Sequence, residues 1–449
     1  MTEQKRAKWA DWADHIRQLD DPAKAFMKPE ALNDLVVLDL SSRSMAGCYC
    51  SSLLAELGAE TIRIEPSDGD LVRTYSPYGI MHQGTGLAYL QEGRNKYHVT
   101  LNLETEEGRE ILKSLAGNAD ILIETYPTGL MDDWGIGYEE LSRINPRLIF
   151  TSITAYGQFG PESSVKHYDY DNVSQARSGT QYQTGEVLPE NKTYEEMPWA
   201  VPTKAGPWIA WAVSGTFAAL GTLAAVYCRE LTCEGQAVEV STPEAYERLN
   251  DYALLWYAEQ GMLNERFGSL DTALWLYGFY PTSDGGVFLG GLRLEMWKAF
   301  VDILGKWDEW GADAWETLAP FTKKDSQLMY QSMINPLTSQ FTSHDLTMKS
   351  IEYAKTGRLA PITPVVAEIN SPAQAMEDEN WIDRGMFTPV EDPVYGTVVC
   401  AQSQWKATET PPRTKWVCRP VGYDNEFIYL KYLGLGPSKL KELADRRVI

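Results

Sequence analysis

The chain has 449 residues, of which 44% are hydrophobic and 11% aromatic, so it is long enough to build two or three domains with sizeable cores. Its 62 acidic and 40 basic residues give a formal net charge of -22. The negative electrostatic field of such a protein repels phosphate backbones and anionic lipids, which argues against nucleic acid or membrane partners. An anionic ligand would need a local cluster of donors.

The first segment, residues 1–33, is polar, with Trp9, Trp12, Ile16 and Leu19 at roughly helical spacing. This pattern predicts an N-terminal helical arm. The segment lacks the charged start, apolar run and cleavage site of a signal peptide, and we expect no stretch to reach the roughly 20 apolar residues of a membrane span. The six cysteines are too scattered for a disulfide scaffold, and they form no zinc-like set, so reduced thiols and a cytoplasmic location are expected.

Residues 34–245 alternate between strand and helix patterns. The apolar run LVVLDL, the helical stretch CYCSSLLAELGA and the run ETIRIEP form a first strand-helix-strand unit, and two similar units follow through DILIETY and LIFTSITAYG. Between the first strand and helix, SSRSMAG places small residues where backbone amides can approach a polar ligand. This alternation predicts an α/β fold, a large Rossmann-like domain with a mostly parallel sheet and helices on both faces.

The second half of this domain has a different sequence pattern, in which a non-periodic segment precedes one helix and one strand. Residues 185–207 lose periodicity and predict a long surface or active-site loop. Residues 209–227 predict a buried helix, and GQAVEVS predicts a returning strand. A linker helix is expected over 246–266.

Residues 267–387 mix aromatic-rich strands, an amphipathic helix (LEMWKAFVDILG) and a proline-punctuated strand, which predicts a smaller α+β domain. Residues 388–449 are expected to return to the large domain. Their last part, with a Gly-Leu-Gly-Pro break, predicts two helices that pack on it.

Six segments are similar, in order and spacing, to the class III CoA-transferase family, which includes formyl-CoA, carnitine and benzylsuccinate CoA-transferases and α-methylacyl-CoA racemases. The segments are VVLDLSSRSMAG, LLAELGAETIRIEPSDGDLVR, EGRNKYHVTLNLETEEGREIL, ADILIETYPTGLMDDWGIGYEELSRINPRLIFTSITAYGQFGP, YDNVSQARSG and CEGQAVEVS.

The resemblance implies an interlocked dimer in which each chain threads through the other. The large domain would hold coenzyme A, which enters as a thioester substrate, with no permanently bound cofactor and no metal. An aspartate would act as nucleophile, forming mixed anhydrides and an enzyme-CoA thioester.

Matching the family's spacing from Gln236 and Gly215 places Trp211 at the position of that aspartate. An indole offers one N–H donor and no nucleophilic lone pair, so the resemblance implies no catalytic nucleophile in this chain. Asp171, in the segment HYDYDNV with Asp169, is the alternative carboxylate.

Other positions of the family's active site divide into matches and departures. The family racemases place their histidine where this chain has Tyr170, so racemisation is not favoured. Glu104 stands where the family usually has a lysine, and Asp133 stands where it has an arginine. These two charge reversals would weaken the attraction for the phosphates of coenzyme A. The family's glycine-rich loop is also absent near Phe267. The resemblance assigns Ser44, Met45, Ala46, Arg73, Leu101, Thr125 and Tyr126 to CoA binding, and Tyr170, Asp171 and Trp211 to the substrate pocket.

We therefore expect the subunit without the nucleophile in a heteromeric CoA-transferase. It would interlock, as a heterodimer or heterotetramer, with a homologous subunit that carries the aspartate and binds the CoA thioester. The donor would be an acyl-CoA such as succinyl-CoA, and the acceptor a carboxylic acid such as (R)-2-benzylsuccinate. The alternatives are a homodimeric transferase with a displaced carboxylate and a non-enzymatic acyl-CoA-binding protein.

Overall fold

A computed structural model describes residues 13–14, 16–17, 22–271, 274, 277–291, 294–310 and 324–449. The chain divides into two compact units. Unit 1 comprises Met1–Thr180, Ala205–Asp251 and Glu379–Ile449, and unit 2 comprises Gln181–Lys204 and Tyr252–Asp378. Most of the expected N-terminal arm, including Trp9, Trp12 and Leu19, lies outside the described residues.

The unit boundaries differ from the expected domains at three places, one of which lies in the linker helix expected over 246–266, where the chain passes from unit 1 to unit 2 between Asp251 and Tyr252. The segment 181–204, expected in the large domain, belongs to unit 2. Hydrogen bonds explain this: the Gly268 N–H donates to the Gly185 carbonyl at 3.1 Å, and Arg266 donates to the Tyr182 carbonyl at 3.0 Å. The return to unit 1 begins at Glu379 rather than at residue 388.

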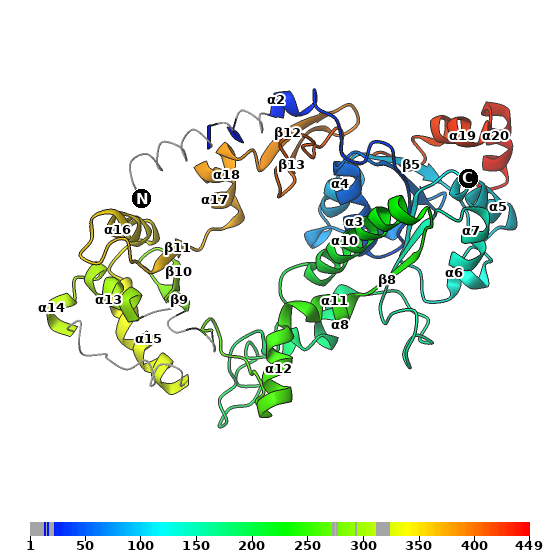
Figure 1. Ribbon diagram of the computed structural model, residues 1–449. Coiled ribbons are helices and arrows are strands. Elements are labelled where there is room, and N and C mark those ends of the chain that lie inside the picture. The colour runs from blue at the N-terminus through cyan, green and yellow to red at the C-terminus, as the bar shows by residue number, and fades with distance from the viewer. Residues whose placement is uncertain are drawn as a thin grey trace. The chain divides into compact units, whose positions relative to one another are not determined.

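Unit 1 is built on a six-stranded sheet in which every pairing is parallel, as predicted (Figure 1). The strand order is β5-β2-β1-β6-β7-β8. The strands are β1 (Val36–Leu40), β2 (Glu60–Glu65), β5 (Lys96–Thr100), β6 (Ile121–Glu124), β7 (Ile149–Thr154) and β8 (Ala237–Ser241). The chain runs outward from β1 in both directions, so the crevice between β1 and β6 is the switch point where ligands bind in such sheets.

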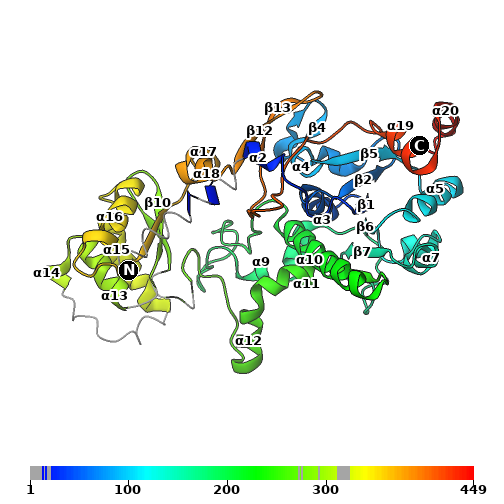
Figure 2. The same ribbon diagram turned by 45° about the horizontal axis from the view of Figure 1, so that its top comes forward.

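Helices cover both faces of this sheet because the buried strands are apolar on both sides (Figures 1 and 2). Val37 and Ile123 belong to one core, while Leu38 and Leu122 belong to the other. The first face carries α3 (Met45–Glu56) and α10 (Ile209–Thr232). The second carries α5 (Glu106–Ala116), α7 (Tyr138–Ile144), α19 (Asn425–Leu433) and α20 (Pro437–Asp445). The last two are the predicted C-terminal pair.

Smaller elements complete unit 1. They are α2 (Pro22–Ala25), β3 (Met81–His82), β4 (Thr85–Gly86), α4 (Leu87–Glu92), α6 (Leu130–Asp133), α8 (Asp171–Arg177), α11 (Thr242–Glu247), α18 (Glu379–Asp383), β12 (Phe387–Asp392) and β13 (Gly396–Ala401).

Unit 2 is the predicted α+β arrangement around an antiparallel sheet of order β11-β10-β9. Its core gathers Tyr280, Trp297 and Phe300. Its elements are β9 (Gly278–Pro281), β10 (Gly286–Gly290), α13 (Leu294–Ile303), α14 (Trp307–Trp310), α15 (Lys324–Thr338), α16 (Ser343–Thr356), β11 (Val365–Glu368) and α17 (Pro372–Glu377); α12 (Asp251–Gln260) leads into it from unit 1.

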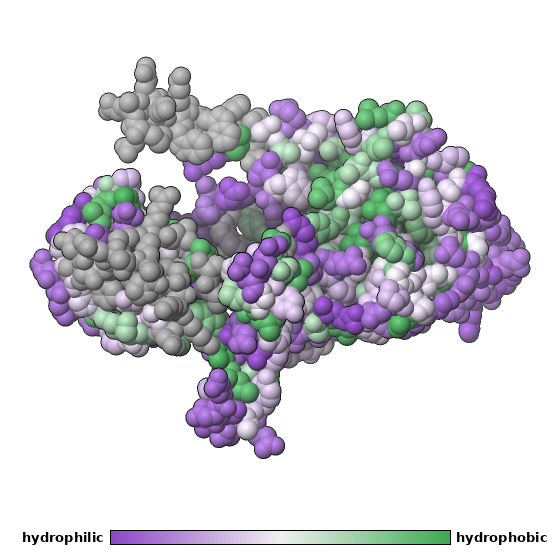
Figure 3. Space-filling view, turned by 60° about the horizontal axis from the view of Figure 1, so that its bottom comes forward, coloured by the Kyte–Doolittle hydropathy of each residue, from purple (hydrophilic) through white to green (hydrophobic). Residues whose placement is uncertain are grey.

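Helix α10 corrects two expectations. With 24 residues and a mean hydropathy of 1.7, it is long and apolar enough to meet the criterion for a membrane span, which we expected of no stretch. It is also buried on one face only, since Leu220, Tyr227 and Leu231 are exposed. Its other face packs on α3 and the sheet, as a core helix does, and exposed apolar patches recur elsewhere on the surface (Figure 3).

Gly215 lets α10 approach α3 closely. A Cβ atom there would lie 2.4 Å from the Ala46 carbonyl oxygen, a backbone atom that cannot move aside. Gly215→Ala is therefore expected to cost about 1–3 kcal/mol of unfolding free energy despite the better helix propensity of alanine. Chemical denaturation measures this. Gly221→Ala, on the same helix, meets no backbone atom and only the Val238 Cγ1 atom at 3.1 Å, so it is expected to cost less than Gly215→Ala.

Glu124 is a buried carboxyl at the end of β6, where it accepts the Tyr126 backbone N–H at 2.7 Å. Burial raises the pKa of Glu124 to about 7. The folded state therefore holds the Glu124 proton more tightly than the unfolded chain does. The free energy of unfolding that this proton contributes is fully present below pH 4.5 and is lost as the pH rises through 7. We expect Glu124→Gln to remove about 2–3 kcal/mol of the stability loss between pH 5 and pH 8. Denaturation at both pH values, with the exposed Glu234→Gln as control, measures it.

Candidate functional site

A cavity of about 820 Å³ opens at the carboxyl ends of β1, β2, β5 and β6, within unit 1. Each strand contributes the residues that follow it, as the switch point of a parallel sheet predicts. Ser42 and Arg43 follow β1, residues 66–71, 73 and 74 follow β2, residues 101–104 follow β5, and Tyr126 follows β6.

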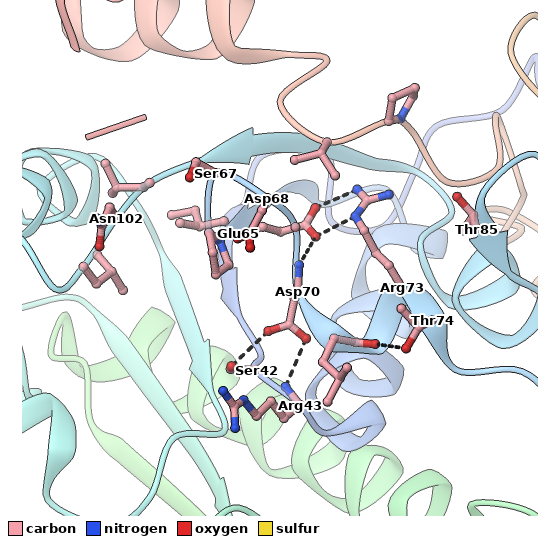
Figure 4. A pocket seen from close by; sticks show the side chains of 18 of the residues that line it. Ser42, Arg43, Glu65, Ser67, Asp68, Asp70, Arg73, Thr74, Thr85 and Asn102 are labelled. Carbon is pink, nitrogen blue, oxygen red and sulfur yellow. Dashed lines mark hydrogen bonds and ion pairs between the residues drawn. The ribbon is translucent and has the colours of Figure 1, made fainter. Parts of the chain in front are cut away.

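Hydrogen bonds join two loops of this cavity (Figure 4). The Asp70 carboxylate accepts the Ser42 hydroxyl at 2.9 Å and the Arg43 backbone N–H at 3.1 Å. Glu65 receives two hydrogen bonds of 2.7 Å from the Arg73 guanidinium, so the charges of this buried pair offset each other. The loop after β2 is therefore fixed against the loop between β1 and α3.

A buried charge network holds the β1 end of the cavity. Asp39 is fully buried and pairs with Arg63 at 3.0 Å and with Lys96 at 3.1 Å. Burial alone would raise the pKa of Asp39, but the two cations and the hydroxyls of Ser41 and Ser51 bring it below the usual range. The paired charges fix the start of the loop that carries Arg43.

The residues assigned to CoA binding separate into two groups. Arg73, Leu101 and Tyr126 line the cavity. The other four do not line it: Ser44 is the buried N-cap of α3, Met45 and Ala46 are in the core, and Thr125 bonds the Ser42 backbone at 2.7 and 2.9 Å.

The two charge reversals are also placed differently. Glu104 is exposed and lines the cavity. Asp133 does not line it, and its carboxylate pairs with Lys166 at 2.6 Å. The expectation that both positions face the ligand is thus corrected, because Glu104 lines the cavity and Asp133 does not.

Trp211 is the third residue of α10 and is 4% exposed. Its ring stacks on Tyr75, with centroids 5.8 Å apart and planes 4° from parallel, and Trp208 stacks on the same tyrosine at 6.2 Å. The Tyr75 hydroxyl donates to the Arg43 carbonyl at 2.8 Å. This aromatic stack therefore adjoins the cavity through Arg43.

Asp169 is the hydrogen-bond partner of the Trp211 indole. The indole N–H donates to its carboxylate at 2.7 Å, and the Thr242 and Ser174 hydroxyls each donate at 2.8 Å. Burial raises the pKa of Asp169, while the three donors oppose that rise. The carboxylate is buried behind the indole rather than presented to the cavity.

Asp171 holds the start of α10. Its carboxylate accepts the backbone N–H groups of Ala210 and Trp211 at 2.9 and 3.1 Å, and the Gln175 amide donates to it at 2.7 Å. This is the geometry of a remote helix cap, which satisfies amides that have no partner inside the helix. Tyr170, the N-cap residue of α8, is 51% exposed.

Sequence reasoning did not assign a site role to Arg43, Tyr75, Asp169 or Trp208. Trp208 and Trp211 are three residues apart at the start of α10, and the recurrence of tryptophan there could have indicated the stack. Asp169 was named only as the neighbour of Asp171, and its contact with Trp211 could not be predicted because it joins residues 42 positions apart in the chain.

The model of the family described as CoA-transferase family III matches residues 32–425. The chain is 28% identical to the succinyl-CoA–D-citramalate CoA-transferase of Chloroflexus aurantiacus, over 94% of this chain and 98% of that protein. It is 29% identical to the alpha subunit of succinyl-CoA–L-malate CoA-transferase from Chloroflexus aurantiacus (93% and 92% covered) and 26% identical to a beta subunit (90% and 95%). A crystal structure of a CaiB/BaiF family protein from Brucella suis superposes with a TM-score of 0.75 at 24% identity, covering 90% of this chain and 99% of that one.

Proposed function

The chain belongs to CoA-transferase family III, and from this membership we propose that it is the subunit without the nucleophile in a heteromeric, cytoplasmic class III CoA-transferase. A homologous partner carries the aspartate. The complex moves coenzyme A from succinyl-CoA to a dicarboxylic acid, releasing succinate and forming the new thioester. Benzylsuccinate is the acceptor that we test first.

One observation carries this proposal. A buried indole, stacked on Tyr75 and hydrogen-bonded to Asp169, stands where the family resemblance places the nucleophilic aspartate. An indole has no lone pair that can attack a thioester. A chain built in this way can complete an active site but cannot form the anhydride.

The neighbouring carboxylates support the same reading. Asp171 is used by the backbone at the start of α10, and Asp169 by three donors in a buried site. A nucleophile must reach the substrate carbonyl at roughly 3–3.5 Å. Neither side chain lines the cavity, so neither is positioned for attack.

The cavity wall supports placing coenzyme A with the partner. Glu104 stands where the family has a lysine, and it faces the cavity. Exchanging an attractive for a repulsive charge beside a phosphate costs on the order of a few kcal/mol before salt screening. The malate transferase relatives, with alpha and beta subunits, offer a precedent for two unlike chains, and the relatives' acceptors include malate, citramalate and mesaconate.

The test is expression of this chain alone and together with a homologue that has aspartate at the position of Trp211. Succinyl-CoA-dependent thioester formation is assayed with benzylsuccinate, malate, citramalate and mesaconate. We expect turnover only from the co-expressed pair. Full activity of the isolated chain would contradict the proposal and favour a displaced nucleophile. Tight CoA binding by the isolated chain, with no turnover by either preparation, would favour an acyl-CoA-binding protein.

A further inference from the structure

Arg43 has an unusual backbone conformation for a non-glycine residue. Its φ angle is 56°, in the left-handed region, where a side chain is strained. Two hydrogen bonds hold it there: its N–H donates to Asp70 at 3.1 Å, and its carbonyl accepts the Tyr75 hydroxyl at 2.8 Å. The fold thus imposes a strained conformation at the cavity, and such strain is concentrated at functional positions.

The side chain of Arg43 lines the cavity (Figure 4). Its guanidinium lies 4.8 Å from the centre of the Tyr168 ring, and it forms no ion pair with any residue that the structure describes. Arg73, the other arginine of the cavity wall, is neutralised by Glu65. Arg43 is therefore the cavity's available guanidinium.

A guanidinium stacked on an aromatic ring keeps its edge free for two parallel N–H donors, which match the two oxygens of a carboxylate. The cavity has room for a small acid, and its other charged groups disfavour a polyanion. The Asp70 carboxylate accepts the Ser42 hydroxyl of the loop after β1, and Asp68 and Glu104 add two further acidic residues to the cavity wall. A ligand with one carboxylate at Arg43 and an uncharged or distant remainder suits this balance better than a chain of phosphates.

We propose that Arg43 anchors a carboxylate of an organic acid in the unit 1 cavity of this chain. The identity of that acid as a substrate of the complex rests on the proposed function, whereas the binding itself does not. Arg43 would then be a binding residue for the acid rather than a group that takes part in bond making.

The test is isothermal titration calorimetry of the isolated full chain with succinate, malate and benzylsuccinate, and with succinamide as a neutral isostere. We expect the acids to bind and the diamide not to. Arg43→Gln should weaken acid binding about 10–100-fold, the loss of a charge-assisted bidentate contact. The acid affinity of Arg43→Lys should lie between those of Arg43→Gln and the unaltered chain, since lysine keeps the positive charge but lacks the two parallel N–H donors of the guanidinium.

Two further variants separate binding from folding. Arg43→Gly suits the left-handed backbone, so it should lose acid binding like Arg43→Gln while keeping or raising the melting temperature. Arg143→Gln, on the exposed surface of α7, should bind like the unaltered chain. The proposal is overturned if no acid binds, if succinamide binds equally well, or if Arg43→Gln binds acids within about twofold of the unaltered chain. It is also overturned if coenzyme A, not the acids, depends on Arg43. Turnover by the co-expressed pair does not enter this titration, so the two proposals fail separately.

Discussion

Replacing Trp211 with alanine is expected to lower the unfolding free energy by about 3–5 kcal/mol. The substitution removes a buried ring stacked on Tyr75 and leaves a void between α10 and its neighbours. It also removes one of the three donors to the buried carboxylate of Asp169. Urea denaturation followed by far-ultraviolet circular dichroism measures the change.

A matched pair of variants separates the two parts of this effect. Trp211→Phe keeps an aromatic ring but lacks the N–H, so about 1–3 kcal/mol should be lost. Trp199→Ala removes a tryptophan that is 62% exposed and should change stability by less than about 0.5 kcal/mol. If Trp211→Ala lowers the free energy of unfolding by less than about 1 kcal/mol, roughly the effect of a surface substitution, Trp211 does not stabilise the fold by packing in the core.

Asp171→Ala is expected to cost about 3 kcal/mol, because two buried backbone N–H groups at the start of α10 lose their acceptor. Asp171→Asn should cost far less, since the amide oxygen can still accept both. When the Gln175 side-chain amide turns over, its Oε1, a buried atom without a partner among the described residues, can accept from the Asn amide. Denaturation of both variants measures the difference.

The same pair of variants distinguishes a cap from a nucleophile. In the co-expressed complex, Asp171→Asn should keep turnover within about threefold, whereas loss of a covalent nucleophile would lower kcat by roughly a thousandfold or more. Asp133→Asn, on the exposed surface beside Lys166, is the control. A collapse of activity in Asp171→Asn with unchanged stability would show that Asp171 takes part in the chemistry.

The parallel sheet was predictable because five of its six strands, all except the edge strand β8, are buried on both faces. The run LVVLDL is almost continuously apolar, ETIRIEP alternates Ile62 and Ile64 with polar residues, and a helical pattern of suitable length lies between them. The tail helices were predictable from the Gly-Leu-Gly-Pro break, which ends α19 at a left-handed glycine and begins α20 with proline. Local patterns of this kind need no knowledge of distant contacts.

The limits of α10 show where that reasoning stops. Its apolar composition predicted burial, yet Leu220, Tyr227 and Leu231 are exposed. Hydrophobic composition indicates that a helix packs somewhere, but which face is covered depends on the elements around it. The same holds for the segment 181–204, whose hydrogen bonds to residues 266–268 assign it to unit 2.

The candidate site was predicted at the level of family position, and less well at the level of contacts. The resemblance placed Trp211 through the family's spacing, whereas its bond to Asp169 joins two distant segments. Arg43 carries no recognisable pattern in SSRSMAG, because its left-handed φ and its place on the cavity wall come from Asp70 and Tyr75. For Asp133, the resemblance predicted a position beside the ligand, but the structure shows its carboxylate in an ion pair with Lys166.

The most direct test is to find which residue becomes covalently attached during turnover. The co-expressed complex is supplied with succinyl-CoA, the enzyme-CoA thioester is trapped with borohydride or hydroxylamine, and the modified peptide is located by mass spectrometry. We expect modification of the partner's aspartate and none in this chain. Modification of Asp169 or Asp171 in this chain would contradict it.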